Sequence, residues 1–113
     1  MSCLFCKIVA REIPATIVAE NEHALAFRDI RPAAPTHMLV IPKKHITSIT
    51  STEDSDALLL GQLMLLARDV ARMDGLDATG YRLVTNNGEN AGQSVFHVHV
   101  HVLGGRAMAW PPG

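Results

Sequence analysis

The sequence predicts an α+β fold in which an antiparallel sheet packs against one long helix, and three observations support this. Short apolar runs bounded by Pro, Gly or Asn favour five strands, at residues 16–20, 25–30, 37–41, 82–86 and 95–103. A long run with helical periodicity covers about residues 53–74. A short helix is expected near the start of the chain, at residues 4–10.

The long predicted helix has signals at both of its ends. The run Ser51-Thr52-Glu53-Asp54 is typical of a capping box, and Gly75 suits a left-handed C-cap. The leucines, methionines and valine of the helix cover more than one stripe of its surface, whereas a surface helix on a small domain needs only one apolar face. We therefore expect a helix that is shared between the core and a partner subunit in a homodimer.

The composition limits the classes of protein to which the chain can belong. Its 113 residues suit one domain, residues 1–113, and 48% hydrophobic with 19% charged residues exclude a disordered chain. A formal charge of −1 argues against bulk capture of nucleic acid or of an anionic membrane. The first residues lack the layout of a secretory signal, and the longest apolar stretch is too short to span a bilayer. The expected location is therefore the cytoplasm, with neither nucleic acid nor a membrane as partner.

Three of the six histidines lie within five residues, as His97, His99 and His101, and valines separate them. In a strand, this alternation places the imidazoles on one face and the valines on the face that packs against the helix. The outer two histidines would start about 13 Å apart along the strand, so a single metal held by all three is unfavourable. A polar, solvent-facing edge is the plain alternative. Catalysis is favoured, because a neutral imidazole is a good nucleophile and, once phosphorylated, a good leaving group.

The segment just before these histidines, residues 86–94, is rich in Asn and Gly and ends with Ser94. Small polar residues of this kind populate most hairpin loops, so the segment alone indicates little. Next to three histidines, it predicts a cradle for an oxyanion or a phosphate, formed by backbone amides and the Ser94 hydroxyl.

Several motifs resemble those of the histidine triad (HIT) superfamily. Residues 92–105, GQSVFHVHVHVLGG, are similar to its His-X-His-X-His signature with apolar X. Four further segments resemble the Hint branch, namely FRDI at residues 27–30, APTH at 34–37, VIPKKH at 40–45 and AWPPG at 109–113. The resemblance covers nearly the whole chain.

This resemblance implies both an architecture and an activity. It implies a homodimer in which two α+β subunits, each with a five-stranded antiparallel sheet, a long helix and a short N-terminal helix, join into one continuous sheet. Hint proteins bind purine nucleoside monophosphates. They hydrolyse the P–N bond of AMP or GMP phosphoramidates, and some acyl adenylates, through a covalent nucleotidyl-histidine.

The resemblance also implies roles for individual residues. His99 would attack the α-phosphorus, His101 would contact the phosphate, and His97 with His37 would complete a hydrogen-bonded cluster behind the nucleophile. Asp29 would hold the ribose hydroxyls, since a carboxylate can accept from both. Phe27 and Ile30 would line the purine pocket. The phosphate or leaving group would be held by Asn86, Gly92, Gln93 and Ser94. Trp110 would approach the partner subunit's site.

Five of these positions also have a local interpretation. Asp29 precedes Ile30-Arg31-Pro32 and suits a turn. Phe27 and Ile30 suit an apolar core, and His37 suits a core histidine at the start of an apolar strand. Trp110 near the end of the chain suits a cap on the core.

The run Cys3-Leu4-Phe5-Cys6 has the spacing of half a zinc site, which two histidines could complete. Members of the HIT superfamily with this cysteine pair can bind structural zinc, and the resemblance assigns the ligands to Cys3, Cys6, His45 and His97. His97 cannot be both a zinc ligand and a free member of the histidine cluster. Two small side chains on a short helix are the alternative. Zinc is not expected to be needed for catalysis, because the triad supplies its own nucleophile.

The leading hypothesis is therefore a hydrolase, a purine nucleoside phosphoramidase that acts through His99. The nearest alternative is a dinucleoside polyphosphate hydrolase of the Fhit type, which the Hint-like C-terminal segment disfavours. A nucleotide-binding or interaction module without essential turnover is an alternative from another class. A metal-binding protein is the last, and it leaves Asp29 and residues 86–94 unexplained.

Overall fold

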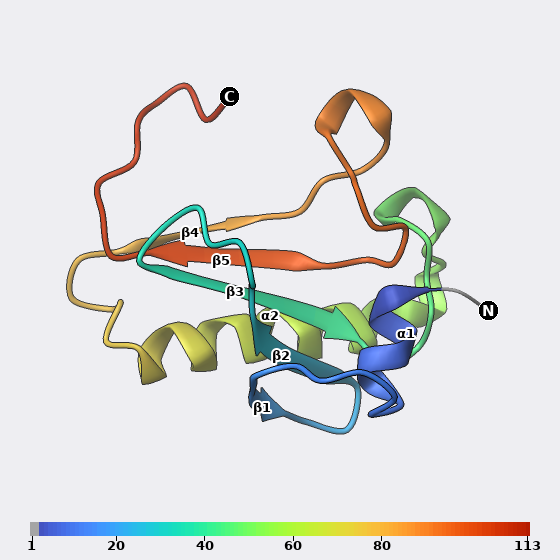
Figure 1. The fold of residues 1–113 in the computed structure, drawn as a ribbon. Coiled ribbons are helices and arrows are strands. Elements are labelled where there is room, and N and C mark those ends of the chain that lie inside the picture. The colour runs from blue at the N-terminus through green and yellow to red at the C-terminus, as the bar shows by residue number, and fades with distance from the viewer. Residues whose placement is uncertain (1–2) are drawn as a thin grey trace.

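Five antiparallel strands form one sheet in the order β1-β2-β3-β5-β4, and α2 runs across one of its faces (Figure 1). The computed structural model describes residues 3–113. The strands are β1 (Ile17–Glu20), β2 (Ala24–Arg28), β3 (Thr36–Pro42), β4 (Tyr81–Val84) and β5 (Val100–Gly104), and the helices are α1 (Leu4–Val9) and α2 (Ala57–Met73). The predicted α+β fold is confirmed.

The two faces of the sheet are apolar, and each packs against its own helix. In β2 and β3, Ala26 and Val40 belong to the core that α2 covers, whereas Phe27 and Leu39 belong to a second core that includes α1. This division follows from the alternation of side chains along a strand. The valines between the histidines, such as Val100, join the α2 side as predicted. His99 and His101 are therefore directed to the side of α1.

The helix α2 buries one stripe and exposes apolar residues on the other side. Its buried residues follow the helical spacing i, i+3, i+4, i+7 and i+8, and they are Leu63, Leu66, Ala67, Val70 and Ala71. Leu58 and Leu65 are 64% and 42% exposed. Within residues 3–113, no helix is long and apolar enough to cross a membrane.

The start of α2 differs from the prediction, and its end agrees with it. A 3-10 turn over Asp54–Asp56 precedes the helix, and the Glu53 N–H donates to the Asp56 carboxylate over 2.9 Å. Ser51 takes no part in this cap, because its hydroxyl is paired with that of Ser48. At the other end, Gly75 has φ +72°, the left-handed conformation expected of a residue that follows a helix.

The strand β5 is shorter than predicted, because it begins at Val100 and not at residue 95. The register pairs Val40 with Val100, so the next hydrogen-bonding position would place Pro42 opposite Val98. Proline has no N–H to donate, and the Pro42 carbonyl accepts from the His97 ring over 2.7 Å. Residues 95–99 therefore leave the sheet. The other four strands begin and end within two residues of their predicted positions.

Candidate active site

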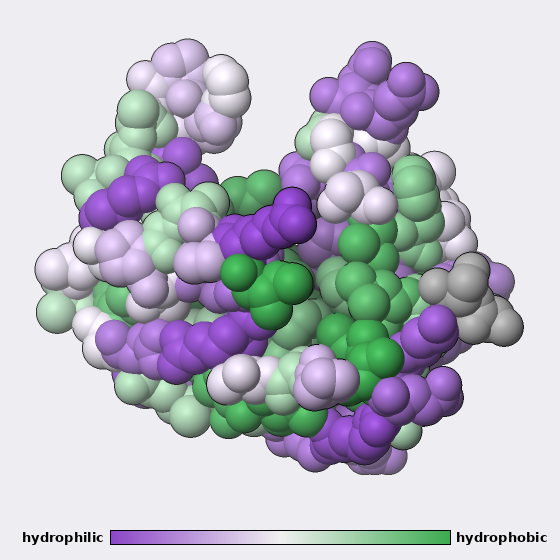
Figure 2. Space-filling view, in the orientation of Figure 1, coloured by the Kyte–Doolittle hydropathy of each residue, from purple (hydrophilic) through white to green (hydrophobic). Residues whose placement is uncertain are grey.

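A cavity of about 390 Å³ opens on the face of the sheet that carries α1. Its apolar walls are formed by Leu4, Phe5, Ile8, Ile13, Pro14, Ala15, Phe27, Ile30, Leu39 and Val95. Its polar and charged lining residues are Arg28, Asp29, Ser94, His99 and His101. An apolar cavity with a few polar groups at one place is typical of a small-molecule site. In Figure 2, the C-terminal segment and the loop over residues 85–95 stand out as two separate projections.

His99 is buried, and its main-chain partner determines which ring nitrogen carries the proton. His99 Nδ1 lies 2.7 Å from the carbonyl oxygen of His97, which can only accept a hydrogen bond. Nδ1 therefore carries the hydrogen of the neutral ring, and the lone pair is on Nε2. A neutral imidazole with a free Nε2 lone pair is suited to attack an electrophile in the cavity.

A chain of hydrogen bonds assigns the protons of His37 and His101 in the same way. The Ala33 N–H donates to His37 Nδ1 over 3.0 Å, so the neutral ring of His37 carries its hydrogen on Nε2. This Nε2–H donates to His101 Nδ1 over 2.8 Å. His101 then presents an Nε2–H donor, and its ring centroid lies 5.0 Å from that of His99. The site therefore combines a nucleophile with an adjacent hydrogen-bond donor.

The electrostatic surroundings keep the supporting histidines neutral. Burial, with smaller contributions from His99 and His37, lowers the pKa of His101 to about 4. Burial also lowers the pKa of His37, although Asp29 opposes this shift. Both rings are therefore neutral at pH 7, as the assigned hydrogen positions require.

Asp29 closes a turn and also lines the cavity. One carboxylate oxygen, Oδ1, accepts from the Arg31 N–H over 2.7 Å and closes the turn that follows β2. The other oxygen, Oδ2, lies 3.4 Å from His37 Nε2. Because Asp29 also lines the cavity, its carboxylate is available to a bound hydroxyl group.

Of the four residues expected to hold a phosphate or leaving group, only Ser94 lines the cavity. Asn86, Gly92 and Gln93 do not line it. The side chain of Gln93 is buried, and its Nε2 donates to the carbonyls of Thr47 and Val95 while its Oε1 accepts from the Gly88 N–H. The Gln93 amide hydrogens are thus used within the protein. The side chain of Gln93 therefore shapes the loop, and the expected role of Gln93 at a phosphate or leaving group stays a prediction.

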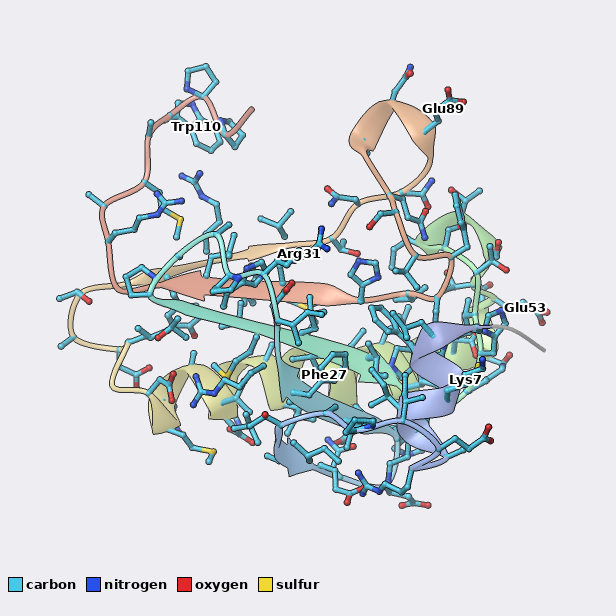
Figure 3. The ribbon with its side chains drawn as sticks, viewed as in Figure 1. Lys7, Phe27, Arg31, Glu53, Glu89 and Trp110 are labelled. Carbon is cyan, nitrogen blue, oxygen red and sulfur yellow. The ribbon has the colours of Figure 1, made fainter. Side chains whose placement is uncertain are left out.

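Phe27, Ile30 and Trp110, which were expected to contact the nucleotide, differ in how far they are buried. Phe27 is both a core residue and a pocket residue, as apolar walls commonly are. Ile30 is 92% exposed at the cavity and is not a core residue. Trp110 is 80% exposed at the end of the C-terminal segment, well separated from Phe27 (Figure 3). A role for Trp110 as a cap on the core is therefore wrong.

A second cluster is formed by Cys3, Cys6, His45 and His97. His97 Nδ1 lies 3.4 Å from Cys3 Sγ, 3.6 Å from Cys6 Sγ and 3.2 Å from His45 Nδ1, and Cys6 Sγ lies 3.2 Å from His45 Nδ1. Tetrahedral zinc, with bonds of about 2.0–2.3 Å, holds its nitrogen and sulfur donors about 3.3–3.8 Å apart. The four residues therefore fit a zinc ion by donor type and by spacing.

The ring of His97 belongs to this second cluster, which corrects the expectation that it joins His37. His97 Nε2 donates to the Pro42 carbonyl, so the lone pair of the neutral ring is on Nδ1 and is directed at the cysteines. Only the main-chain carbonyl of His97 serves His99. The pKa of the Cys6 thiol is raised by burial and by the neighbouring Cys3, which disfavours the thiolate of Cys6.

The atoms of Asp29, His37 and His101 also lie close enough together to suggest a metal site. The hydrogen-bond chain argues against it. With Ala33 donating to Nδ1, the Nε2 of neutral His37 carries a hydrogen and has no lone pair for a metal. This cluster is therefore a chain of hydrogen bonds at the wall of the cavity, which Asp29 and His101 line.

Sequence reasoning missed the part that α1 plays in the cavity. Leu4, Phe5 and Ile8 line it, and Phe5 also contacts the histidines, with ring centroids 5.1 Å from His99 and 5.9 Å from His97. The apolar spacing of these three residues indicates one helix face. No local signal says which part of the sheet that face covers.

Known proteins resemble the chain over almost its full length. Residues 10–108 match the family model described as the HIT domain. The 14 kDa zinc-binding protein of Zea mays is 51% identical over 112 residues, which cover 97% of this chain and 87% of that protein. The crystal structure of a HIT family hydrolase from Legionella pneumophila Philadelphia 1 matches with a TM-score of 0.96 and 55% identity, over 99% of this chain and 100% of that chain. A histidine triad nucleotide-binding protein from Candida albicans matches with a TM-score of 0.84 and 33% identity, over 97% of this chain and 83% of that chain. The chain therefore belongs to the HIT family.

Proposed function

We propose that this protein is a hydrolase of the Hint branch that cleaves the P–N bond of purine nucleoside 5′-phosphoramidates. One observation carries the proposal. The hydrogen bond from His99 Nδ1 to the His97 carbonyl leaves an Nε2 lone pair at the wall of an apolar cavity, beside the Nε2–H of His101. The names of the relatives from Legionella pneumophila and Candida albicans, a hydrolase and a nucleotide-binding protein, support it.

The proposed reaction has two displacements at phosphorus. First, the bond from His99 Nε2 to the α-phosphorus forms while the P–N bond breaks, and the leaving amine takes a proton from water. The hydroxide that remains then attacks phosphorus, the bond to Nε2 breaks, and the nucleoside monophosphate is released. One water molecule is consumed overall. His101 Nε2–H donates to a phosphate oxygen in both steps and stabilises the charge that develops there.

The rest of the cavity supports a nucleoside as the group that is bound. Phe27 and Ile30 offer apolar surface for a purine ring, and the Asp29 carboxylate can accept from ribose hydroxyls. Most of the wall is apolar and distinguishes weakly between bases. We therefore assign both AMP and GMP derivatives to the site.

The test compares two substrate classes in steady state. The wild-type protein should hydrolyse adenosine 5′-phosphoramidate and guanosine 5′-phosphoramidate, each more rapidly than diadenosine triphosphate. Faster cleavage of diadenosine triphosphate would favour a dinucleoside polyphosphate hydrolase. Binding of AMP with turnover of neither class would favour a nucleotide-binding module.

We also propose that Cys3, Cys6, His45 and His97 hold a structural zinc ion. Zinc at this place cross-links the chain around α1 and is not part of the reaction. The name of the maize relative supports zinc binding. The purified protein should contain one equivalent of zinc by atomic absorption, and Cys6→Ser should lose it. A zinc-free wild-type protein that takes up none when zinc is supplied would contradict this assignment.

A homodimer completes the proposal. Leu58, Gly61 and Leu65 lie on the side of α2 opposite to the buried stripe, and a Cβ added at Gly61 would meet nothing within 4 Å. β4 is an edge strand, with a free edge for pairing. We propose that a second copy covers this helix face and continues the sheet, which brings Trp110 toward the partner's cavity.

A further inference from the structure

The short helix α1 contributes residues to the cavity, and it begins at the cysteine–histidine cluster formed by Cys3, Cys6, His45 and His97. Cys3 is its N-cap, and Cys3 and Cys6 belong to the cysteine–histidine cluster. Leu4, Phe5 and Ile8 line the cavity. Neighbouring residues of one helical turn therefore belong either to the cysteine–histidine cluster, as Cys6 does, or to the wall of the cavity, as Phe5 does. Figure 3 shows this helix, which carries the labelled Lys7, beside the sheet.

Phe5 contacts His97 of the cysteine–histidine cluster and His99 of the cavity. Its ring lies edge-on to His99, with centroids 5.1 Å apart and an interplanar angle of 86°, and edge-on to His97, with centroids 5.9 Å apart. It also packs against Phe27, with centroids 5.6 Å apart. Only 4% of Phe5 is exposed. A shift of α1 would therefore change the contact of Phe5 with the His99 ring.

The position of α1 depends on its attachments, because a helix of six residues is not stable by itself. Its apolar residues pack against β2 and β3, and its two cysteines face His45 and His97. When the four ligands share one ion, the residues on either side of the Leu4-Phe5 pair are tied to His97. The ring of Phe5 is then held against His99 from the same side.

We propose that Phe5 is a positioning residue that couples zinc occupancy of the cysteine–histidine cluster to the orientation of His99 and to nucleotide affinity. The proposal rests on the proposed function for its nucleotide, but not for its effect on His99. Because coupling between two binding sites is reciprocal, zinc should strengthen nucleotide binding by the same factor by which the nucleotide strengthens zinc binding.

The first experiment measures this coupling with AMP as the probe. AMP affinity is determined by calorimetry for the zinc-loaded protein and after zinc removal with a chelator, in wild type, Phe5→Leu and Lys7→Ala. Lys7 lies on the same helix but does not line the cavity, so Lys7→Ala is the matched control. Zinc removal should weaken AMP binding about tenfold in wild type and Lys7→Ala, and less than about threefold in Phe5→Leu. An equal loss in Phe5→Leu and wild type would overturn the proposal.

A second measurement needs no nucleotide and separates the proposal from the proposed function. The ¹⁵N and ¹H signals of the His99 ring are recorded with and without zinc. They should shift on zinc removal in wild type, and by much less in Phe5→Leu or in Phe5→Met, a second variant that keeps apolar volume. Circular dichroism checks that each sample is folded. Unchanged His99 signals in wild type would overturn the proposal. Shifted signals without phosphoramidase activity would leave the coupling standing and contradict only the proposed function.

Discussion

At the scale of single residues, the hydrogen-bond partners of the imidazoles distinguish four roles among chemically equal side chains. His97 donates from Nε2 to a carbonyl and directs its lone pair at the cysteines, whereas His99 donates from Nδ1 and keeps its lone pair on Nε2. His37 accepts at Nδ1 from a main-chain N–H and donates from Nε2 to His101 Nδ1. A main-chain group determines which nitrogen is basic in His37, His97 and His99, whereas the ring of His37 determines it in His101.

Removing the nucleophile should separate chemistry from binding. We expect His99→Ala to reduce turnover of adenosine 5′-phosphoramidate by at least about 10³-fold, because the covalent route is lost. AMP affinity should change by less than about threefold, since the cavity walls remain. His101→Ala should weaken both turnover and binding, because the proposed mechanism has its Nε2–H donate to the phosphate in the complex and during the reaction. Kinetics and calorimetry on the two variants check this.

A histidine outside the site provides the control for these variants. His23 lies between β1 and β2 and does not line the cavity, so His23→Ala should retain wild-type turnover. Turnover by His99→Ala equal to that of His23→Ala would contradict the assigned mechanism.

At the scale of elements, α2 has one buried face and one exposed apolar face, and the proposed dimer uses the exposed face. Leu65→Lys changes the exposed face, so we expect it to shift the protein from dimer to monomer in analytical ultracentrifugation. Leu63→Ala changes the buried face, where 1% of the side chain is exposed, and should lower the free energy of unfolding by about 2–4 kcal/mol. A Leu65→Lys protein with an unchanged sedimentation coefficient would place the dimer interface elsewhere.

The strands and helices also show which features of the fold could be predicted from the sequence. The alternation of valines and histidines predicted which face of the sheet each set occupies, because the period of a strand is a local property. The first residue of β5 depends on Pro42, which lies far away in sequence on the neighbouring strand. Local signals therefore could not show that the predicted strand at residues 95–103 was too long. The same holds for Phe5. Its helix was predicted, but its contact with His99 arises only from the packing of α1 on the sheet.

Site residues that belong to a sequence motif could be predicted, whereas the hydrogen-bond partners that depend on the folded geometry could not. His99, His101, Ser94 and Asp29 all line the cavity. The sequence did not predict that the buried side-chain amide of Gln93 bonds to main-chain groups of its own loop and of Thr47. A side chain in a glycine-rich loop can face inward or outward, and the sequence pattern is the same in both cases.

At the scale of the whole molecule, the buried neutral histidines make stability depend on pH. The pKa of His101 is about 4 in the folded protein, against about 6.5 when unfolded, and burial also lowers the pKa of His37. Between these two values the unfolded chain binds more protons, so stability is lost as the pH falls through this range. With solvent screening discounted, we expect a loss on the order of 2 kcal/mol from pH 7 to pH 4 for His101.

Urea denaturation at both pH values, with a chelator present so that zinc release does not contribute, measures this loss. His101→Gln should show a smaller pH dependence than wild type. An equal pH dependence in the two proteins would show that His101 is not the group responsible.

The measurement that tests the central claim most directly is the capture of the intermediate. Wild-type protein is mixed with adenosine 5′-phosphoramidate, quenched within the first turnover and analysed by intact-mass spectrometry and peptide mapping. The account predicts a mass increase of one adenylyl group, located on His99 and missing from His99→Ala. Rapid turnover with no adenylylated protein at any quench time, or with the group on another residue, would contradict it.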